Sequence, residues 1–264
     1  MTARAFDLRE AMNAKAGHRG RLRLPRWLHA FTLPPVREAF LRQVYFTGIQ
    51  ATSVILFRGA AVGTVIIAYM MKVLNADVST TTNILLLVVF REVGPLFAAI
   101  MVIFRSASAA TSELALMSIS GELRTMRQLG LQQFELLVLP RVAGISLATV
   151  ALTIYFQIIA VSGGIILAPF LIDASILQLA NEFLSAASLW DIGYSVTKSF
   201  AFGAIIAGVS CAQGLRLDRQ ELGAVPQAVT RAIMQSVAYV FLFNAVFAYF
   251  VFGVLVFGIF RAEG

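Results

Sequence analysis

The sequence predicts an all-α integral membrane protein: five transmembrane helices preceded by an N-terminal interfacial amphipathic helix, with a short cytoplasmic helix between the second and third spans. Composition is the first reason, because 59% of the 264 residues are hydrophobic and only 13% are charged, against roughly a quarter charged in a soluble domain. The second is a mean hydropathy of +0.81. The third is that apolar residues gather into stretches long enough to cross a bilayer.

The N-terminal residues 1–26 form a basic segment, and residues 27–264 form one membrane domain without a linker. The formal net charge is +7, but the basic residues neither line one helix nor alternate with exposed aromatics, so nucleic acid is not an expected partner. Instead, nine of them lie within the first 46 positions: Arg4, Arg9, Lys15, Arg19, Arg21, Arg23, Arg26, Arg37 and Arg42. The charge therefore indicates membrane topology.

The stretch from Trp27 to Tyr45 mixes aromatic and aliphatic residues with charged ones and contains Pro34 and Pro35. It is too polar for the hydrocarbon core, which favours an amphipathic helix in the membrane interface. The alternative is a solvated linker.

The five apolar stretches are all long enough for helical spans. Positive residues in short loops favour the cytoplasmic side. Loops 105–135 and 215–231 carry three arginines each, whereas 72–83 and 169–189 hold only one lysine between them. This asymmetry places the N-terminus in the cytoplasm and, with five spans, the C-terminus on the opposite side of the membrane. The predicted spans are 47–71, 84–104, 136–168, 190–214 and 232–260.

Several kinds of chemistry lack the residues they require. The histidines, His18 and His29, both lie in the N-terminal region, so no span supplies a histidine-based dyad or a zinc-binding HExxH motif. None of the three lysines follows a glycine, so the chain has no phosphate-binding loop for ATP. Cys211 lies in an apolar stretch and is expected to be a buried small hydrophobe. We therefore expect no enzyme, no metal and no cofactor in this chain.

Four of the ionisable residues within the predicted spans are candidates for function, because charges there are expensive and usually functional. Arg58 could meet an anionic headgroup, pair with Glu92 or Glu113, or reach the interface. Arg91 and Glu92 are neighbours, and because neighbours on an α-helix point about 100° apart, one is expected to line a cavity while the other pairs elsewhere. Lys198 either contacts substrate, forms an ion pair or extends to the interface.

Small residues mark two predicted helix contacts. Gly59 and Gly63 form a GxxxG motif in the first span, and Gly203, Ala204, Ala207 and Gly208 offer a comparable face in the fourth. Such faces let helices approach closely. Packing within one chain is the favoured interpretation, with dimerisation as the alternative.

A short helix of about nine residues is predicted over 121–129 in the loop between the second and third spans. Ser120 is the expected N-cap, and Gly130 is expected to end the helix in the left-handed conformation. Leu123 and Met126 form one stripe, whereas Arg124, Arg127 and Gln128 face another way. This arrangement is typical of a helix that docks onto a partner, and a loop helix without a partner is the alternative.

These residues resemble a known family of membrane permeases. Three parts of the sequence carry the resemblance: Phe90-Arg91-Glu92-Val93-Gly94-Pro95-Leu96, Arg105 and Thr111-Ser112-Glu113-Leu114. They resemble the LRELGP…GR…TAELG signature of the MlaE permeases, also called YrbE. Further similarities run in order along residues 40–257. They are Arg42-Gln43-Val44-Tyr45-Phe46-Thr47-Gly48, Met126-Arg127-Gln128-Leu129-Gly130, Pro140-Arg141, Lys198-Ser199 and Val229-Thr230-Arg231-Ala232.

The resemblance implies the permease subunit of an ABC transporter in the bacterial inner membrane, moving phospholipid to or from a periplasmic protein tunnel and so maintaining outer-membrane lipid asymmetry. It implies a homodimer, a separate MlaF-like ATPase that binds ATP and Mg²⁺, and a periplasmic MlaD-like MCE-domain protein. The implied ATPase-coupling helix comprises Glu122, Leu123, Arg124, Met126, Arg127, Gln128 and Leu129. The lipid-binding cavity expected between the two copies is lined by Ile66, Tyr69, Arg91, Glu92 and Leu96.

Two other functional classes are compatible with five apolar spans. A stand-alone secondary transporter or channel for a hydrophobic substrate is the main alternative, although the common transporters contain internal repeats that this sequence lacks. A membrane-embedded lipid-modifying enzyme is the other, and the lack of histidines and clustered carboxylates in the spans argues against it.

Overall fold

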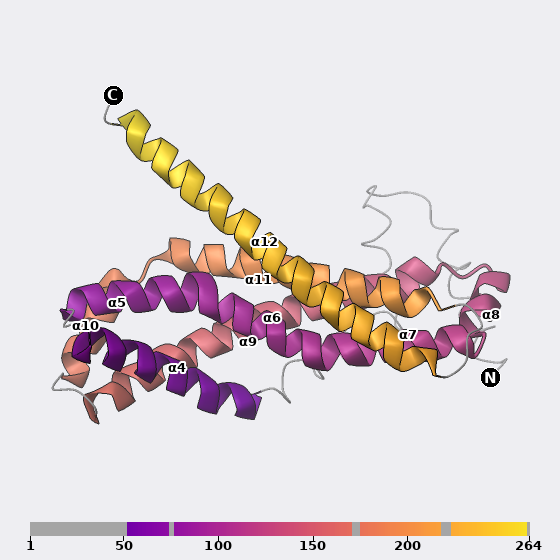
Figure 1. The fold of residues 1–264 in the computed structure, drawn as a ribbon, viewed down its shortest axis with the longest axis horizontal. Helices are drawn as coiled ribbons and strands as arrows, with labels where there is room; N and C mark the ends of the chain where they lie inside the picture. The colour runs from indigo at the N-terminus through magenta and orange to yellow at the C-terminus, as the bar shows by residue number, and fades with distance from the viewer. Residues whose placement is uncertain (1–51, 74–76, 171–174, 218–222, 263–264) are drawn as a thin grey trace, which may run out of the picture.

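A computed structural model describes residues 52–73, 77–170, 175–217 and 223–262, and every regular element in these ranges is helical (Figure 1). This confirms the predicted all-α class. The basic segment 1–26 and the predicted interfacial helix 27–45 lie outside the described residues. The elements in chain order are α4 (Thr52–Lys72), α5 (Val78–Leu86), η2 (Leu87–Val93), α6 (Gly94–Val102), η3 (Ile103–Ala107), α7 (Ser108–Ile119), α8 (Glu122–Gln128), η4 (Phe134–Val138), α9 (Leu139–Leu167), η5 (Ala168–Phe170), α10 (Ile176–Ala186), α11 (Leu189–Leu215) and α12 (Ala224–Ala262).

Four helical segments among the described residues are long and apolar enough to cross a membrane, and three of them lie close to the predicted third, fourth and fifth spans. In addition, α4 is a helix of 21 residues that covers the predicted first span from Thr52 onward. The number of crossings in the whole chain stays a prediction. The four segments are Val78–Ile119, Phe134–Leu167, Leu189–Leu215 and Ala224–Phe250.

The second predicted span is too short. It was expected over 84–104, but the helix runs for 42 residues from Val78 to Ile119. At its start Asp77 caps α5, accepting a hydrogen bond from the Thr80 backbone N–H at 3.3 Å. Hydrogen bonds from the Thr80 side chain and backbone hold the pKa of Asp77 below its ordinary value. Hydropathy falls at Arg105, but the small residues that follow are compatible with a helix, so the backbone continues through them.

Two π-helical segments, η2 and η3, interrupt this long helix. A π-helix bonds each N–H to the carbonyl five residues back, which widens the turn, and such segments are frequent at functional sites. The segment η2 contains Arg91 and Glu92, and η3 contains Arg105. The charged residues of this span therefore lie where its helix departs from α geometry.

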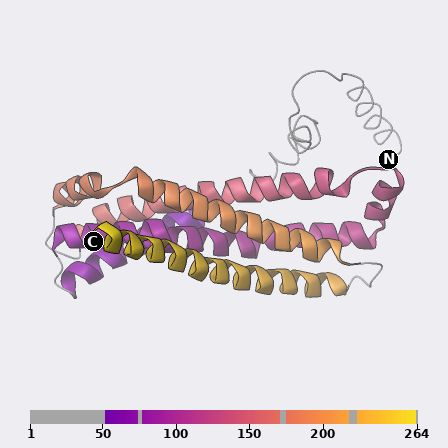
Figure 2. The same ribbon diagram turned by 90° about the horizontal axis from the view of Figure 1, so that it is seen from above.

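Most helices run along the long axis of the molecule, with α8 at one end and α10 at the other (Figure 1). The helix α12 crosses the others obliquely in that view, and Figure 2 shows it along one side of the bundle. The sequence treated 169–189 as a loop, but it contains the helix α10, which packs on α5. The opposite placement of α8 and α10 agrees with the prediction that loops 105–135 and 169–189 lie on opposite sides of the membrane.

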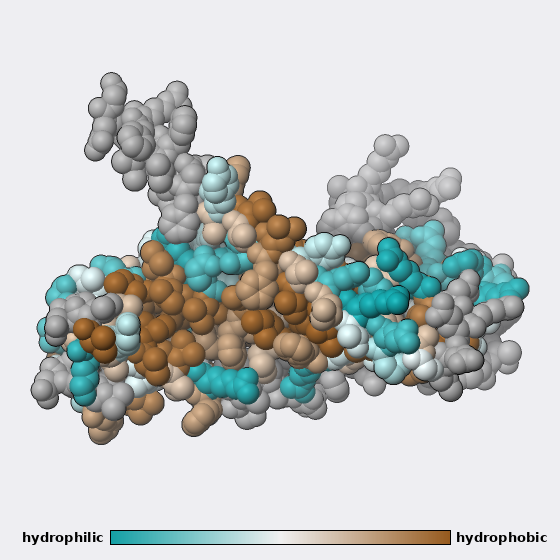
Figure 3. All heavy atoms as spheres, viewed as in Figure 1, coloured by the Kyte–Doolittle hydropathy of each residue, from teal (hydrophilic) through white to brown (hydrophobic). Residues whose placement is uncertain are grey.

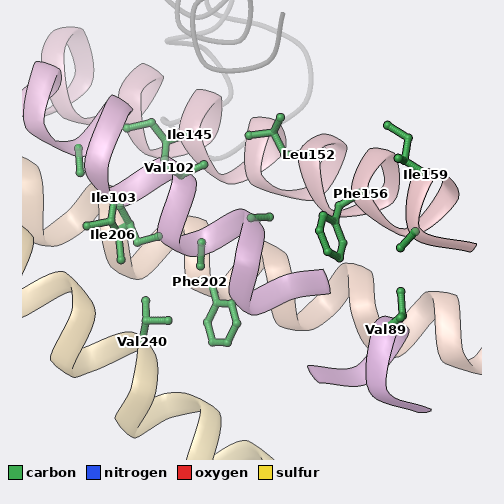
Figure 4. Packing of buried hydrophobic residues seen from close by; sticks show 14 of the residues in the cluster. Val89, Val102, Ile103, Ile145, Leu152, Phe156, Ile159, Phe202, Ile206 and Val240 are labelled. Carbon is green, nitrogen blue, oxygen red and sulfur yellow. The ribbon is translucent and has the colours of Figure 1, made fainter. Parts of the chain in front are cut away.

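The hydrophobic core forms where α6, α9 and α11 meet. Phe97 and Phe156 stack with ring centroids 4.6 Å apart, and Phe202 is fully buried. Figure 4 shows Phe202 on α11 facing Val240 of α12. Burying aromatic rings in this way contributes a large share of core packing. Cys211 is also buried, as predicted.

The GxxxG motif of the first span packs against α9 of the same chain, which confirms the intramolecular interpretation. A Cβ added at Gly63 would lie 1.7 Å from the carbonyl oxygen of Ala160, and one added at Gly163 would lie 2.5 Å from Cα of Ala60. Only glycine permits this approach. In the fourth span, Gly203 packs closely on Ser146, whereas a Cβ at Gly208 would meet nothing within 4 Å. The second small-residue face is therefore only partly used for packing in the chain.

Large apolar side chains cover much of the outer surface. In Figure 3 they gather over the middle and left of the visible face, whereas hydrophilic residues gather toward the right end, where α7 and α8 lie. Exposed examples include Phe104, Ile158 and Phe200. A soluble protein rarely exposes so large an apolar area, so this surface is suited to lipid.

Candidate functional site

The centre of the candidate site is η2, where Arg91 and Glu92 interrupt an apolar run. Pro95 follows at the start of α6, and because proline has no N–H, it removes the α-helical donor that would serve the Arg91 carbonyl four residues earlier. That carbonyl instead accepts a hydrogen bond from Nζ of Lys198 at 2.7 Å. The Gly-Pro step thus creates an acceptor inside the span, and a cation of α11 satisfies it.

Lys198 is fully buried, with no exposed side-chain surface. Its Nζ also lies 2.9 Å from Oε1 of Glu92. The interface-reaching alternative for Lys198 is therefore wrong, because the ammonium ends inside the protein between two acceptors. A buried charge without such partners would be strongly destabilising.

Arg91 pairs with Asp191 at the start of α11. Its Nη2 lies 2.8 Å and its Nε 2.9 Å from the same carboxylate oxygen, Oδ1. Asp191 and Lys198 are seven residues apart, about two helical turns, so they lie on one face of α11. We refer to Arg91, Glu92, Asp191 and Lys198 as the charged cluster.

The prediction that only one of Arg91 and Glu92 pairs, while the other lines a cavity, is wrong in that both form ion pairs, each with a residue of α11. The prediction assumed α-helical geometry, in which neighbours are about 100° apart. In η2 the helix departs from that geometry, and α11 can hold both side chains because Asp191 and Lys198 lie about two turns apart on it.

Two further helices contribute polar contacts that the sequence did not predict. Nδ2 of Asn244 in α12 donates to Oε2 of Glu92 at 3.2 Å. From α9, Nε2 of Gln157 donates to Oγ of Ser195 at 2.5 Å and to the carbonyl of Phe90 at 3.3 Å. Polar contacts from α9, α11 and α12 thus converge on η2 and the α11 residues that hold it.

Aromatic rings flank the charged cluster on the side of α12. The Tyr194 ring centroid lies 5.9 Å from Cζ of Arg91 and 5.5 Å from Nζ of Lys198. Tyr194 in turn lies 5.2 Å from the ring of Phe247, which stacks on Phe243 at 5.5 Å. An aromatic face attracts cations, so the Tyr194 ring stabilises the positive charges of Arg91 and Lys198.

The other predicted cavity residues lie around this region without joining the charged cluster. Ile66 on α4 and Leu96 on α6 are partly buried against the hydrophobic core. Tyr69 on α4 is exposed. Their assignment to a lipid cavity between two copies stays a prediction.

Arg58 lies exposed on α4. Both of its predicted partners are bound to other cations: Glu92 to Lys198, and Glu113 to Arg141 with Nη2 2.9 Å from Oε2. The headgroup and interface alternatives for Arg58 stay open.

The helix predicted over 121–129 is present as α8, from Glu122 to Gln128. It ends as predicted at Gly130, with φ +72°. The Leu131 N–H donates to the Met126 carbonyl at 3.0 Å and the Gly130 N–H to the Arg127 carbonyl at 3.1 Å, which is a Schellman motif. Gly130 and this motif fix the end of α8.

The predicted N-cap of this helix is wrong. The cap residue is Gly121, in the left-handed conformation with φ +80°, and Ser120 donates its hydroxyl hydrogen to the Met117 carbonyl at 3.2 Å instead. Because the left-handed turn at Gly121 directs the chain sharply out of α7, it is the glycine that starts α8.

The two stripes of α8 differ in exposure. Leu123 is 7% exposed and Met126 half-buried, whereas Arg124, Arg127, Gln128 and Leu129 are exposed. The side-chain amide of Gln133 donates to the Leu123 carbonyl, which holds α8 against the following turn. The face available to a partner is therefore the polar and basic one. A groove of about 420 Å³ adjoins α8, lined by Glu113, Leu116, Met117, Ile119, Ser120 and Glu122.

Within the described ranges, no group of three or more His, Cys, Asp and Glu side chains could hold a metal ion. The site instead offers paired charges in an apolar span and a solvent-exposed basic helix. Sequence reasoning missed Asp191, Asn244 and Gln157. The spacing of Asp191 and Lys198 was a usable signal, because two opposite charges seven residues apart on an apolar helix match an adjacent Arg-Glu couplet elsewhere.

Comparison with known proteins places these features in one family. The family model described as Permease MlaE matches residues 40–250, which include η2, α8 and all of the charged cluster. A probable ABC transporter permease protein of Synechocystis sp. is 26% identical over 218 residues, covering 82% of each chain. One of Rickettsia conorii is 24% identical over 216 residues, covering 80% of this chain and 82% of the relative. The protein TRIGALACTOSYLDIACYLGLYCEROL 1, chloroplastic, of Arabidopsis thaliana is 31% identical over 170 residues, covering 64% of this chain and 48% of that protein.

Proposed function

This chain belongs to the MlaE permease family, and we propose that it is the membrane subunit of an ABC transporter that moves phospholipid between the bacterial inner membrane and a periplasmic protein tunnel. The observation that carries the proposal is the charged cluster, which places Arg91 and Glu92, 26% and 34% exposed, within an apolar span. Intramembrane charges usually mark a substrate path. The name of the Arabidopsis relative is that of a glycosylated diacylglycerol, which supports a lipid as the substrate in the broad sense.

In the proposed mechanism the chain performs no covalent chemistry. A lipid headgroup meets the exposed parts of Arg91 and Glu92, and the acyl chains lie against apolar side chains that include Ile66, Tyr69 and Leu96. Asp191 and Lys198 hold the two headgroup contacts in place through their ion pairs. The maintenance of outer-membrane lipid asymmetry would follow from such transport.

We propose that two copies pair through α12 and enclose this lipid cavity. Only 11% of the most apolar window of Ala224–Phe250 is buried in the single chain, against 39–50% for the other three segments. Its exposed side chains include Tyr239, Leu242, Val246 and Tyr249. A two-fold symmetric dimer would cover this face and would bring two copies of Asn244 toward a shared space.

The energy source is a separate ATPase, which would bind ATP and Mg²⁺ and receive α8 on its surface. The basic face of α8, with Arg124 and Arg127, is the proposed contact. Closure of two ATPases on ATP would move α8 and change the affinity of the cavity for lipid, as a ligand-driven population shift does. A periplasmic MCE-domain protein would bind at the opposite end, beside α10. This arrangement assumes five spans, a cytoplasmic N-terminus and a periplasmic C-terminus.

The test is transport of a fluorescent phospholipid by the chain co-purified with its ATPase in proteoliposomes. Glu92→Lys should abolish ATP-dependent lipid transport while the ATPase stays bound, because the substitution places a third cation beside Lys198 and Arg91. The matched control is Lys72→Glu, which reverses an exposed charge at the end of α4 and should leave transport unchanged. Wild-type transport by Glu92→Lys would remove the cluster from the lipid path. Failure of the chain to retain any ATPase would favour a stand-alone transporter or channel.

A further inference from the structure

We propose that the charged cluster makes this chain selective for zwitterionic phospholipids, in which a phosphate is joined to an amine, over phospholipids whose headgroup has a net negative charge. The inference rests on the proposed lipid-transport function and specifies its substrate class. It is carried by three observations: the charge balance of the cluster, the identity of its exposed groups and an unpaired acceptor on Asn244.

The first observation is that the charges of the cluster cancel. Its two cations and two anions form two direct pairs, Arg91 with Asp191 and Lys198 with Glu92. Each positive group therefore already has a negative partner within 2.9 Å. An anionic headgroup would bring an additional negative charge into an apolar region without a free cation to receive it, which is costly. A zwitterionic headgroup brings no net charge.

The second observation is that the cluster exposes one group of each sign. Lys198 is fully buried and Asp191 is 13% exposed, whereas Arg91 and Glu92 are 26% and 34% exposed. A guanidinium has five N–H donors, and Arg91 uses Nε and Nη2 on Asp191, so donors remain for a phosphate. The carboxylate of Glu92 can accept further hydrogen bonds from an ammonium group. The exposed pair is thus complementary to a phosphate and an amine side by side.

The third observation concerns Asn244. Because a carboxylate only accepts hydrogen bonds, the amide nitrogen of Asn244 must face Glu92, as it does at 3.2 Å. Its other polar atom, Oδ1, is buried and has no hydrogen-bond partner. A buried acceptor without a donor is unfavourable. An ammonium group with three donors, bound beside Glu92, would lie next to this oxygen and could satisfy it.

The neighbouring rings are consistent with a cation at this position. Tyr194 and Phe247 lie 5.2 Å apart on the α11 and α12 sides of the cluster, and the Tyr194 ring already lies within 6 Å of two cations. Aromatic faces attract ammonium groups. The aromatic residues would therefore favour an amine headgroup and give nothing to an uncharged glycerol headgroup.

The experiment is a competition between two lipids with the same acyl chains. The purified full-length chain is incubated with mixed micelles containing equal amounts of phosphatidylethanolamine and phosphatidylglycerol, and the retained lipids are quantified by mass spectrometry. We expect phosphatidylethanolamine to be enriched on the order of tenfold over phosphatidylglycerol, the ratio given by about 1.4 kcal/mol. Equal retention of the two lipids would overturn the inference but not the proposed function. Retention of neither would overturn both.

Two isosteric variants should shift this ratio in opposite directions. Asp191→Asn frees Arg91 from its counter-ion and should turn the preference toward phosphatidylglycerol. Asn244→Asp adds a negative charge beside Glu92 and should increase the preference for phosphatidylethanolamine. Glu113→Gln is the matched control, because it removes a carboxylate about 30 Å along the helix from Glu92 and should leave the ratio unchanged.

Opposite shifts exclude a general loss of folding, since misfolding would change both variants in the same direction. Each variant is also compared with the unmodified chain by size-exclusion chromatography. A shift in the same direction for Asp191→Asn and Asn244→Asp, or no shift in either, would assign the cluster a purely structural role and overturn the inference.

Discussion

The charged cluster and α8 both concentrate charged side chains, but they hold them in opposite ways. In the cluster, Arg91 pairs with Asp191 and Lys198 with Glu92. On α8, Glu122, Arg124 and Arg127 are exposed, and none of them forms an ion pair with another described residue. The charged cluster lies between apolar helices, whereas α8 lies at an exposed end of the molecule. This difference in surroundings explains why the charges are paired in the cluster and unpaired on α8.

The charges of the cluster therefore stabilise the fold, whereas those of α8 are available to a partner. In an apolar environment a charge needs a counter-ion and hydrogen bonds, because its desolvation is otherwise uncompensated. At a solvated surface the same charge keeps its hydration, and a surface ion pair would add little. Substitutions in the cluster should therefore affect stability, whereas those on α8 should affect assembly.

The largest effect is expected for Lys198→Met, which leaves Glu92 without its cation and the Arg91 carbonyl without its side-chain donor. Breaking one side of a buried ion pair costs about 3–5 kcal/mol. Thermal unfolding of the detergent-purified variant should show a clearly lowered Tm. In the double variant with Glu92→Gln the loss should be smaller, since no uncompensated charge remains. Equal Tm values for Lys198→Met and the unmodified chain would show that the ion pairs of the cluster contribute no more to stability than the exposed charges of α8.

An intermediate effect is expected for Gly130→Ala, at the end of α8. A Cβ there meets nothing within 4 Å, so the cost comes only from the left-handed backbone at φ +72°, about 1–2 kcal/mol. Fraying of α8 should increase the rate of trypsin cleavage at Arg124 and Arg127. Gly208→Ala provides the control, because it also adds a methyl group into open space but within a regular helix. Unchanged cleavage of Gly130→Ala would mean that α8 does not depend on its Schellman motif.

The smallest effect on stability is expected for the double variant Arg124→Gln and Arg127→Gln. Both side chains are exposed, so the free energy of unfolding should change by no more than about 0.5 kcal/mol. Retention of the ATPase in co-purification should nevertheless fall, since the basic face of α8 is its proposed contact. If this double variant retained the ATPase but were clearly less stable, the arginines of α8 would serve the fold and not the contact with the ATPase.

The long apolar helices and the glycine-bounded helix α8 were predictable, whereas the short helix α10 was not. For the third, fourth and fifth spans, most of the ends predicted from hydropathy lie within a few residues of the observed helix ends. The signal is strong because a helix that crosses a membrane requires about 20 apolar residues in a row. It ended the second span at 104, because hydropathy falls at Arg105, whereas the helix passes through Arg105 in η3 and continues to Ile119. It gave no helix for 169–189, where the 11 residues of α10 are too few for a span.

The candidate site was predicted only in part. Arg91, Glu92 and Lys198 attracted attention because charges are rare in spans, but their partners were not foreseen. Asn244 and Gln157 are single polar residues in apolar runs, but they carry no charge that would indicate a partner. Their roles depend on the rotation of α12 and α9 about their axes.

The sequence by itself determined that this protein resides in a membrane, where most of its spans lie and how α8 ends, because these properties depend on residues close together in the chain. Only the tertiary structure decided which charges pair. The two ion pairs of the cluster join residues 100 and 106 positions apart, across helices whose relative rotation no local pattern encodes. Whether an intramembrane cation is free to meet a ligand or already neutralised depends on that rotation, and the structure shows that here the charges cancel within the protein.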